Sequence, residues 1–90
     1  MPVLIAATTA AADSADVTLA AGASVTFLLN GGLLGSLPYG AVALIQAKSG
    51  AQYVTIGQID SQNPLRVLAA SGVFRVSKQI SDGAVGVDQN

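Results

Sequence analysis

Hydrophobic residues recur at every second position through much of the chain, which is the period of a half-buried β-strand. The clearest case is the segment 24–30, where Val25, Phe27 and Leu29 fall on one face of an extended chain. Shorter or less regular alternation predicts further strands over 3–9, 16–20, 41–48, 52–59 and 84–87.

The stretch 63–78 is the strongest candidate for an organising element. Two apolar runs rich in branched residues flank a turn of small residues that includes Gly72, which is typical of an antiparallel hairpin. Pro64 has no N–H to donate, so it suits the first position of a strand. We expect Val67 to point inward with Phe74 and Val76, which would set Arg66 and Arg75 on the outer face.

Glycines suggest how two other strands are joined. The pair Ser49-Gly50 predicts a hairpin between 41–48 and 52–59, and Gly57 predicts a bulge or a close backbone approach. The run 41–48 is apolar almost throughout and bounded by glycines, so we expect a strand buried on both faces.

These elements predict an all-β fold, a small antiparallel β-sandwich or barrel of about six to seven strands with almost no helix. Ninety residues suit one domain. The Ala-rich start could pair as a strand or extend as an arm. We expect an extended N-terminal arm over 1–13 and a single β-domain over 14–90.

Charge changes the picture of the surface. Only 10% of the residues are charged, the net charge is −1, and 51% of the residues are hydrophobic, whereas about 25% of an ordinary globular protein is charged. Such a surface is typical of one covered by other protein subunits. No basic patch is present for nucleic acid, and no apolar run approaches the roughly 20 residues that span a bilayer.

Catalytic chemistry has little to work with. The chain has no His, Cys or Glu, so the usual nucleophile and base pairs cannot be assembled. Asp13 and Asp16 are three positions apart, and they are read more simply as turn carboxylates than as a calcium site with Asp82 or Asp88. We expect no enzymatic activity, no metal and no cofactor.

Interaction is the more promising role for the remaining features. The Gly-rich loop 31–40 holds large apolar side chains that either fold back over the core or press into a partner. The arginines could be solvated, or they could pair with Asp from another strand or another subunit. Tyr39 and Tyr53 offer a weak alternative as a sugar-stacking platform. The candidate interaction residues are Val3, Leu4, Ile5, Leu33, Leu34, Leu37, Tyr39, Arg66 and Arg75.

The segments 17–26, 49–50, 63–67, 72–76 and 86–88, taken in this order, resemble small virion proteins of tailed bacteriophages, over roughly residues 16–88. The resemblance implies a capsid decoration or cementing protein. Such proteins are found in the virion, assembled in the host cytoplasm, and they bind the outside of the head as oligomers. The implied partners are the major capsid protein, other virion subunits and copies of the chain itself. A phage tail, collar or fibre component, and a β-sandwich module that binds carbohydrate or a cell surface, are the alternatives.

Overall fold

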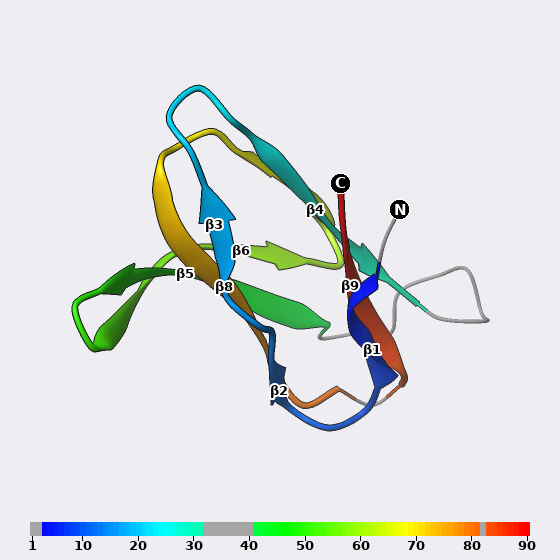
Figure 1. Cartoon of the computed structure of the whole chain (residues 1–90). Coiled ribbons are helices and arrows are strands. Elements are labelled where there is room, and N and C mark those ends of the chain that lie inside the picture. The colour runs from blue at the N-terminus through cyan, green and yellow to red at the C-terminus, as the bar shows by residue number, and fades with distance from the viewer. Residues whose placement is uncertain (1–2, 32–40, 82) are drawn as a thin grey trace.

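Nine β-strands form the regular structure of the part of the chain that the computed structural model describes, residues 3–31, 41–81 and 83–90 (Figure 1). No described residue is helical. The predicted all-β fold is confirmed, as a sandwich and not a barrel, with nine strands where about six to seven were expected. The strands are β1 (Val3–Thr8), β2 (Ala12–Asp13), β3 (Val17–Leu19), β4 (Val25–Asn30), β5 (Val42–Ser49), β6 (Gln52–Asp60), β7 (Leu65–Leu68), β8 (Gly72–Lys78) and β9 (Val85–Gln89).

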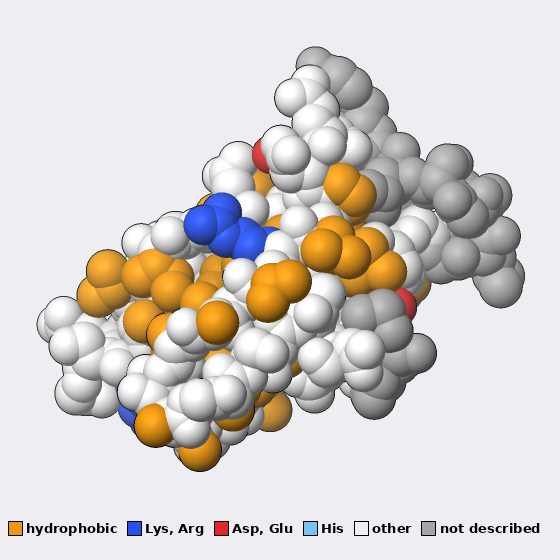
Figure 2. Space-filling view, turned by 90° about the horizontal axis from the view of Figure 1, so that it is seen from above, with side chains coloured by type: hydrophobic (Ala, Val, Ile, Leu, Met, Phe, Trp, Pro, Cys, Tyr) orange, Lys and Arg blue, Asp and Glu red, His pale blue; other side chains and the backbone are white. Residues whose placement is uncertain are grey.

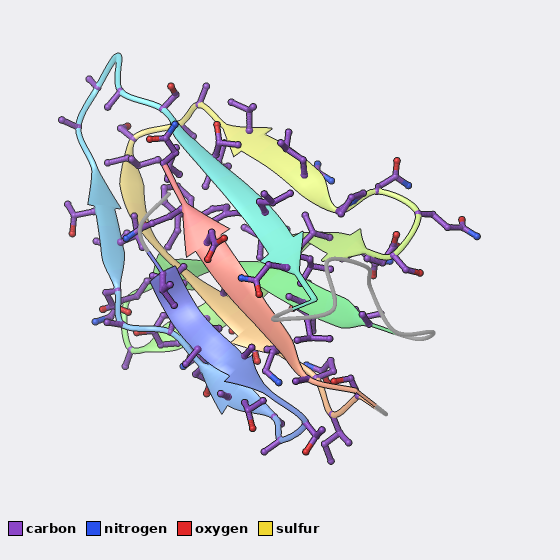
Figure 3. All side chains as sticks on the ribbon, turned by 90° about the vertical axis from the view of Figure 1, so that its right-hand side faces the viewer. Atoms are coloured by element: carbon purple, nitrogen blue, oxygen red, sulfur yellow. The ribbon has the colours of Figure 1, made fainter. Side chains whose placement is uncertain are left out.

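The strands form two antiparallel sheets. Sheet A has the order β1-β9-β4-β7, and Figure 3 shows these four strands side by side. Sheet B has the order β2-β8-β5-β6, with β3 also paired to β8. Strands β2 and β3 follow one another along the same edge of β8, and Ser14 bridges the gap between them: its N–H donates to the Val76 carbonyl, and its hydroxyl accepts from the Val76 N–H.

The hydrophobic core lies between the sheets and is built from the alternation that the sequence displays. Val25, Phe27 and Leu29 of β4 are buried, as are Phe74 and Val76 of β8. Strand β5 alternates too, with Ala43 and Ile45 buried and Leu44 and Gln46 half-buried. The prediction that this strand is buried on both faces is therefore wrong, because a two-layer sandwich leaves one face of each sheet open to solvent.

The hairpin between β5 and β6 is confirmed. Ser49 pairs with Gln52, so the loop consists of Gly50 and Ala51, and Gly50 has the positive φ of 62° that the first central position of a type II′ turn requires. The bulge at Gly57 is confirmed as well. Gly57 pairs with Ile45 and Thr55 with Gln46, which leaves Ile56 as the extra residue.

The predicted hairpin over 63–78 is wrong. Strand β7 pairs with β4 in sheet A, whereas β8 pairs with β5, β2 and β3 in sheet B. The link of residues 69–71 crosses from one sheet to the other. Among the described strands, β5 and β6 are the one consecutive pair that hydrogen-bonds to each other. Alternation tells which residues face the core, but it does not tell which strands become neighbours.

Both ends of the described chain lie in the sheets. The segment expected as an extended arm is extended, but β1 pairs with β9 and β2 pairs with β8. The strand predicted over 84–87 is found as β9, and it lies between β1 and β4. Gly86 is essential to this arrangement, because a Cβ there would lie 2.7 Å from the Ile5 carbonyl oxygen.

Candidate functional site

The outer face of sheet B carries a network of charged and polar side chains. Cross-strand pairing sets Lys48 beside Tyr53 and Arg75 beside Gln46. Asp13 pairs with Ser77, whose hydroxyl donates to the Asp13 carboxylate at 2.6 Å. Since neighbouring residues across a pair of strands point to the same side, these groups meet on one surface.

Asp16 is the centre of one half of this network. The Tyr53 hydroxyl donates to Asp16 Oδ1 at 2.6 Å, and Lys48 Nζ lies 3.6 Å from Asp16 Oδ2. The hydrogen bond from Tyr53, together with the Lys48 charge, lowers the pKa of Asp16 below its ordinary value. The same hydrogen bond raises the pKa of Tyr53, because ionised tyrosine could not donate it.

Arg75 is the centre of the other half of this network. Its guanidinium carbon lies 3.7 Å from the centre of the Tyr53 ring, its Nε donates to Gln46 Oε1 at 2.7 Å, and its Nη1 lies 3.5 Å from Asp13 Oδ2. One face of the Tyr53 ring is thus covered by a cation. The charges on this face satisfy one another. Lys48 Nζ also lies over the Tyr53 ring, 5.9 Å from its centre, so two cations lie against the ring that was considered for sugar stacking.

Metal and membrane chemistry have no visible basis in the described ranges. No three or more Asp side chains of residues 3–31, 41–81 and 83–90 come together as a metal site. No helix within these ranges is long and apolar enough to cross a membrane.

The outer face of sheet A differs strongly from that of sheet B in its chemistry. One row crosses all four strands, with Val3 beside Asp88, Asp88 beside Leu28, and Leu28 beside Leu65. The Asp88 carboxylate accepts a hydrogen bond of 2.9 Å from the Asn30 amide. We call this surface the neutral face, and it comprises Val3, Thr26, Leu28, Asn30, Leu65, Val67 and Asp88.

The neutral face is apolar where it is most open. Val3 is 66% exposed, Leu65 53% and Val67 57%. Asp88 is its one charged member, and it faces an amide rather than a cation. Large exposed aliphatic side chains grouped with so little charge are typical of a surface that another protein covers.

A groove lies where the edge strands of the two sheets, β6 and β7, approach each other. It has a volume of about 440 Å³. Arg66 pairs with the buried Phe27 and so points to the inner side of sheet A, toward β6. A Cβ at Gly57 would lie 3.0 Å from Arg66 Cζ, so the guanidinium occupies the space that this glycine leaves. We call this the β6–β7 groove, and its lining residues are Gln58, Asp60, Asn63, Leu65, Arg66 and Val67.

Asp60 holds the loop at the end of the same groove. Its Oδ1 accepts the backbone N–H groups of Gln62 and Asn63 at 3.0 and 2.9 Å, and its Oδ2 accepts from the Gln58 amide at 3.1 Å. The hydrogen bond from Asn63 and then that from Gln62 lower the pKa of Asp60, so the carboxylate stays ionised.

The structure places the predicted interaction residues in different settings. Val3 is exposed on the neutral face, and Leu4 is partly buried against the core. Ile5 is 7% exposed, so its proposed contact with a partner is wrong: it faces the core opposite Val87. Leu33, Leu34, Leu37 and Tyr39 lie outside the described residues.

The two arginines lie on different surfaces of the protein. Arg75 pairs with Asp13 of another strand, one of the outcomes that the sequence left open. Arg66 does not lie on the outer face as expected, and Val67 does not point inward. Strand β7 pairs with β4 in the register that turns both residues the other way, because a shift by one position exchanges the faces of a strand.

Sequence reasoning missed two groupings. The bond between Tyr53 and Asp16 joins residues 37 positions apart, and no local pattern announces it. The exposure of Leu65 and Val67 had a signal, since the alternation over 65–68 allows either face to be buried.

No known protein family matches this chain, and neither a curated protein nor a solved structure matches it.

Proposed function

We propose that this chain is a structural accessory protein of a tailed-bacteriophage virion that binds other virion subunits through its neutral face. The observation that carries the proposal is the near absence of charge on an exposed four-stranded surface. Val3, Leu65 and Val67 are each more than half exposed there. Burying such side chains against a protein is favourable, and little desolvation of charge opposes it.

The rest of the surface supports a structural role. The charges on the outer face of sheet B are engaged with one another, through Asp16 with Lys48 and Asp13 with Arg75. Groups held in this way are not arranged to bind or transform a small substrate. A nearly uncharged surface on one side and a surface of mutually paired charges on the other suit a protein that coats an assembly.

The resemblance to small phage virion proteins supplies the kind of assembly. A decoration protein binds a repeating shell in many copies, so a modest contact made by each copy gains from multivalency. Attachment to the head is the site we favour, and a tail, collar or fibre position is the alternative.

The proposal can be tested on virions of the phage that encodes the chain. Heads assembled without the protein would be mixed with purified full-length chain and sedimented. We expect wild-type chain to pellet with the heads, and Val3→Lys to bind at least tenfold more weakly because it sets a charge in the neutral face. Thr18→Lys is the matched control, since Thr18 is an exposed strand residue on sheet B.

Two outcomes would count against the proposal. Wild-type chain that fails to pellet with heads or tails would overturn the virion role. Equal binding by Val3→Lys and Thr18→Lys would show that the neutral face is not the contact. Labelled chain at the tail in electron micrographs would select the alternative position.

A further inference from the structure

We infer that the β6–β7 groove is a contact between two copies of this chain related by a two-fold axis, with Arg66 of each copy paired to Asp60 of the other. The groove borders the neutral face and shares Leu65 and Val67 with it. The inference nevertheless does not rest on the proposed virion role, whose test changes Val3, a residue outside the groove. It begins with the charges of the described residues and the partner that each one has.

Among the described residues, Arg66 is the cation that has no acidic partner. Lys48 and Arg75 each have an Asp within 3.6 Å. Lys78 is 1% exposed and donates to the Thr8 carbonyl oxygen at 2.6 Å. Arg66 is exposed, and no Asp among residues 3–31, 41–81 and 83–90 lies within ion-pair distance of it.

Arg66 nevertheless packs against the neighbouring strand. Its guanidinium lies against Gly57 at the bulge of β6, where any side chain would displace it. An arginine whose side chain already packs against its own fold loses less conformational freedom when it forms an ion pair, so its placement favours a contact.

Asp60 is the matching anion. Three hydrogen bonds from Gln58, Gln62 and Asn63 orient its carboxylate, but none of these donors is a cation. Asp60 lines the same groove as Arg66, and the two do not pair within one copy. A two-fold axis through the groove sets each group against its opposite, which is how an isologous interface becomes self-complementary.

Apolar side chains are exposed on both strands that border the groove. Val54 and Ile56 of β6 are 52% and 47% exposed, and Leu65 and Val67 of β7 are 53% and 57% exposed. These four are most of the six large hydrophobic residues that are exposed in the described part of the chain. Figure 2 shows a face of the molecule on which hydrophobic side chains gather on both sides of a basic one.

The second copy is favoured over a continuous strand pairing or a charged partner. The bulge at Ile56 and the four-residue length of β7 make both edges poor templates for an added strand. The groove contains one cation and one anion, so two copies do not repel each other there. An interface with apolar side chains around an arginine also resembles the energetic centre of known protein contacts.

The test is a charge exchange followed by sedimentation velocity of the full chain over a range of concentrations. Arg66→Glu sets two like charges against each other at both symmetric pairs, and Asp60→Lys does the same with the opposite sign. We expect each variant alone to have a dimer dissociation constant at least tenfold above that of wild type. An equimolar mixture of the two restores attraction at both pairs, so we expect heterodimers with an affinity near that of wild type.

Two controls distinguish loss of the dimer contact from a general effect of net charge and from loss of folding. Lys48→Glu changes the net charge by the same amount on the outer face of sheet B, and it should dimerise as wild type does. Asp60→Asn keeps an oxygen to accept the loop N–H groups, so it removes the charge with the turn preserved. It should raise the dissociation constant at least tenfold even if Asp60→Lys does not fold.

A second measurement uses the absence of cysteine from the chain. Leu65→Cys should be joined into dimers by a short bismaleimide linker, whereas Thr18→Cys should not. A wild-type chain that stays monomeric at millimolar concentration would overturn the inference. So would folded Arg66→Glu and Asp60→Lys chains that do not associate when mixed. Either result with normal binding to heads would leave the proposed virion role intact.

Discussion

The outer faces of the two sheets have the same strand geometry but opposite chemistry. On sheet B, Asp13, Asp16, Lys48 and Arg75 form two ion pairs joined through the ring and hydroxyl of Tyr53. On sheet A, the row of side chains that crosses all four strands has one charged member, Asp88. Four of the nine charged residues of the chain thus pair with one another on one face. The outer face of sheet A is nearly uncharged, which is a distribution suited to contact with another protein.

The largest expected effect concerns the backbone packing that supports the neutral face. Gly86→Ala sets a methyl group 2.7 Å from the Ile5 carbonyl oxygen, where β9 and β1 cannot separate without breaking sheet A. We expect a loss of about 1–3 kcal/mol in the free energy of unfolding, measured by urea denaturation. The exposed neighbour Ala84→Ser should change it by less than about 0.5 kcal/mol. Equal stabilities would show that sheet A tolerates a wider strand spacing than described.

The next effect concerns the charged side chain that links the two sheets. Burial lowers the pKa of Lys78, so the folded state disfavours its ammonium form. Stability should therefore rise with pH between the folded pKa and the unfolded value of about 10.4. Lys78→Met lacks this titration, and we expect it to melt at a higher temperature than wild type near neutral pH. The two melting curves should converge toward pH 10, and a difference independent of pH would contradict the explanation.

A smaller effect would sharpen the description of the sheet B network. Tyr53→Phe removes the donor to Asp16, whose pKa is lowered in the folded state. The stability that this carboxylate contributes is present above its unfolded pKa of about 3.9 and is lost as the pH falls through the folded pKa. We expect Tyr53→Phe to melt slightly below wild type at pH 7, with the difference vanishing in acid. A constant difference from pH 7 to pH 2 would exclude Asp16 as its source.

The smallest effect is a spectroscopic one. Asp16→Asn removes the main cause of the raised pKa of Tyr53, so the tyrosine should ionise at lower pH than in wild type. Ultraviolet absorbance titration in a Tyr39→Phe background reports Tyr53 alone. Asp13→Asn is the control, because the Asp13 charge is the weakest of the causes that raise this pKa. Equal shifts in the two variants would show a diffuse effect of charge in place of the hydrogen bond.

The sequence predicted the strands better than their neighbours. Alternation in 24–30 and the turn at Gly50 depend on contacts within a few residues, and both predictions are confirmed. The partner of β7 depends on a strand some 40 residues away, so proximity in the chain wrongly suggested β8. The same uncertainty of register exchanged Arg66 and Val67 between the faces.

The candidate surfaces show the same difference between local features, which the sequence predicts, and long-range pairing, which it does not. Composition alone indicated a charge-poor exterior, but not that two ion pairs would meet on the outer face of one sheet. The pairing of Asp16 with Tyr53 and the fit of Arg66 over Gly57 arise when distant strands are brought together. Such groupings have no local signal, because each depends on the register of at least two strand pairs.

The position of β9 also has a consequence for how the chain acquires its structure. Strands β1 and β4 are both neighbours of β9 and not of each other. While the chain is being synthesised, the early strand β1 thus has no place in sheet A until Val85–Gln89 has emerged from the ribosome. The nascent protein must keep its apolar segments apart until that late strand arrives, so we expect slow folding, with a period in which chaperones have access to β1 and β4.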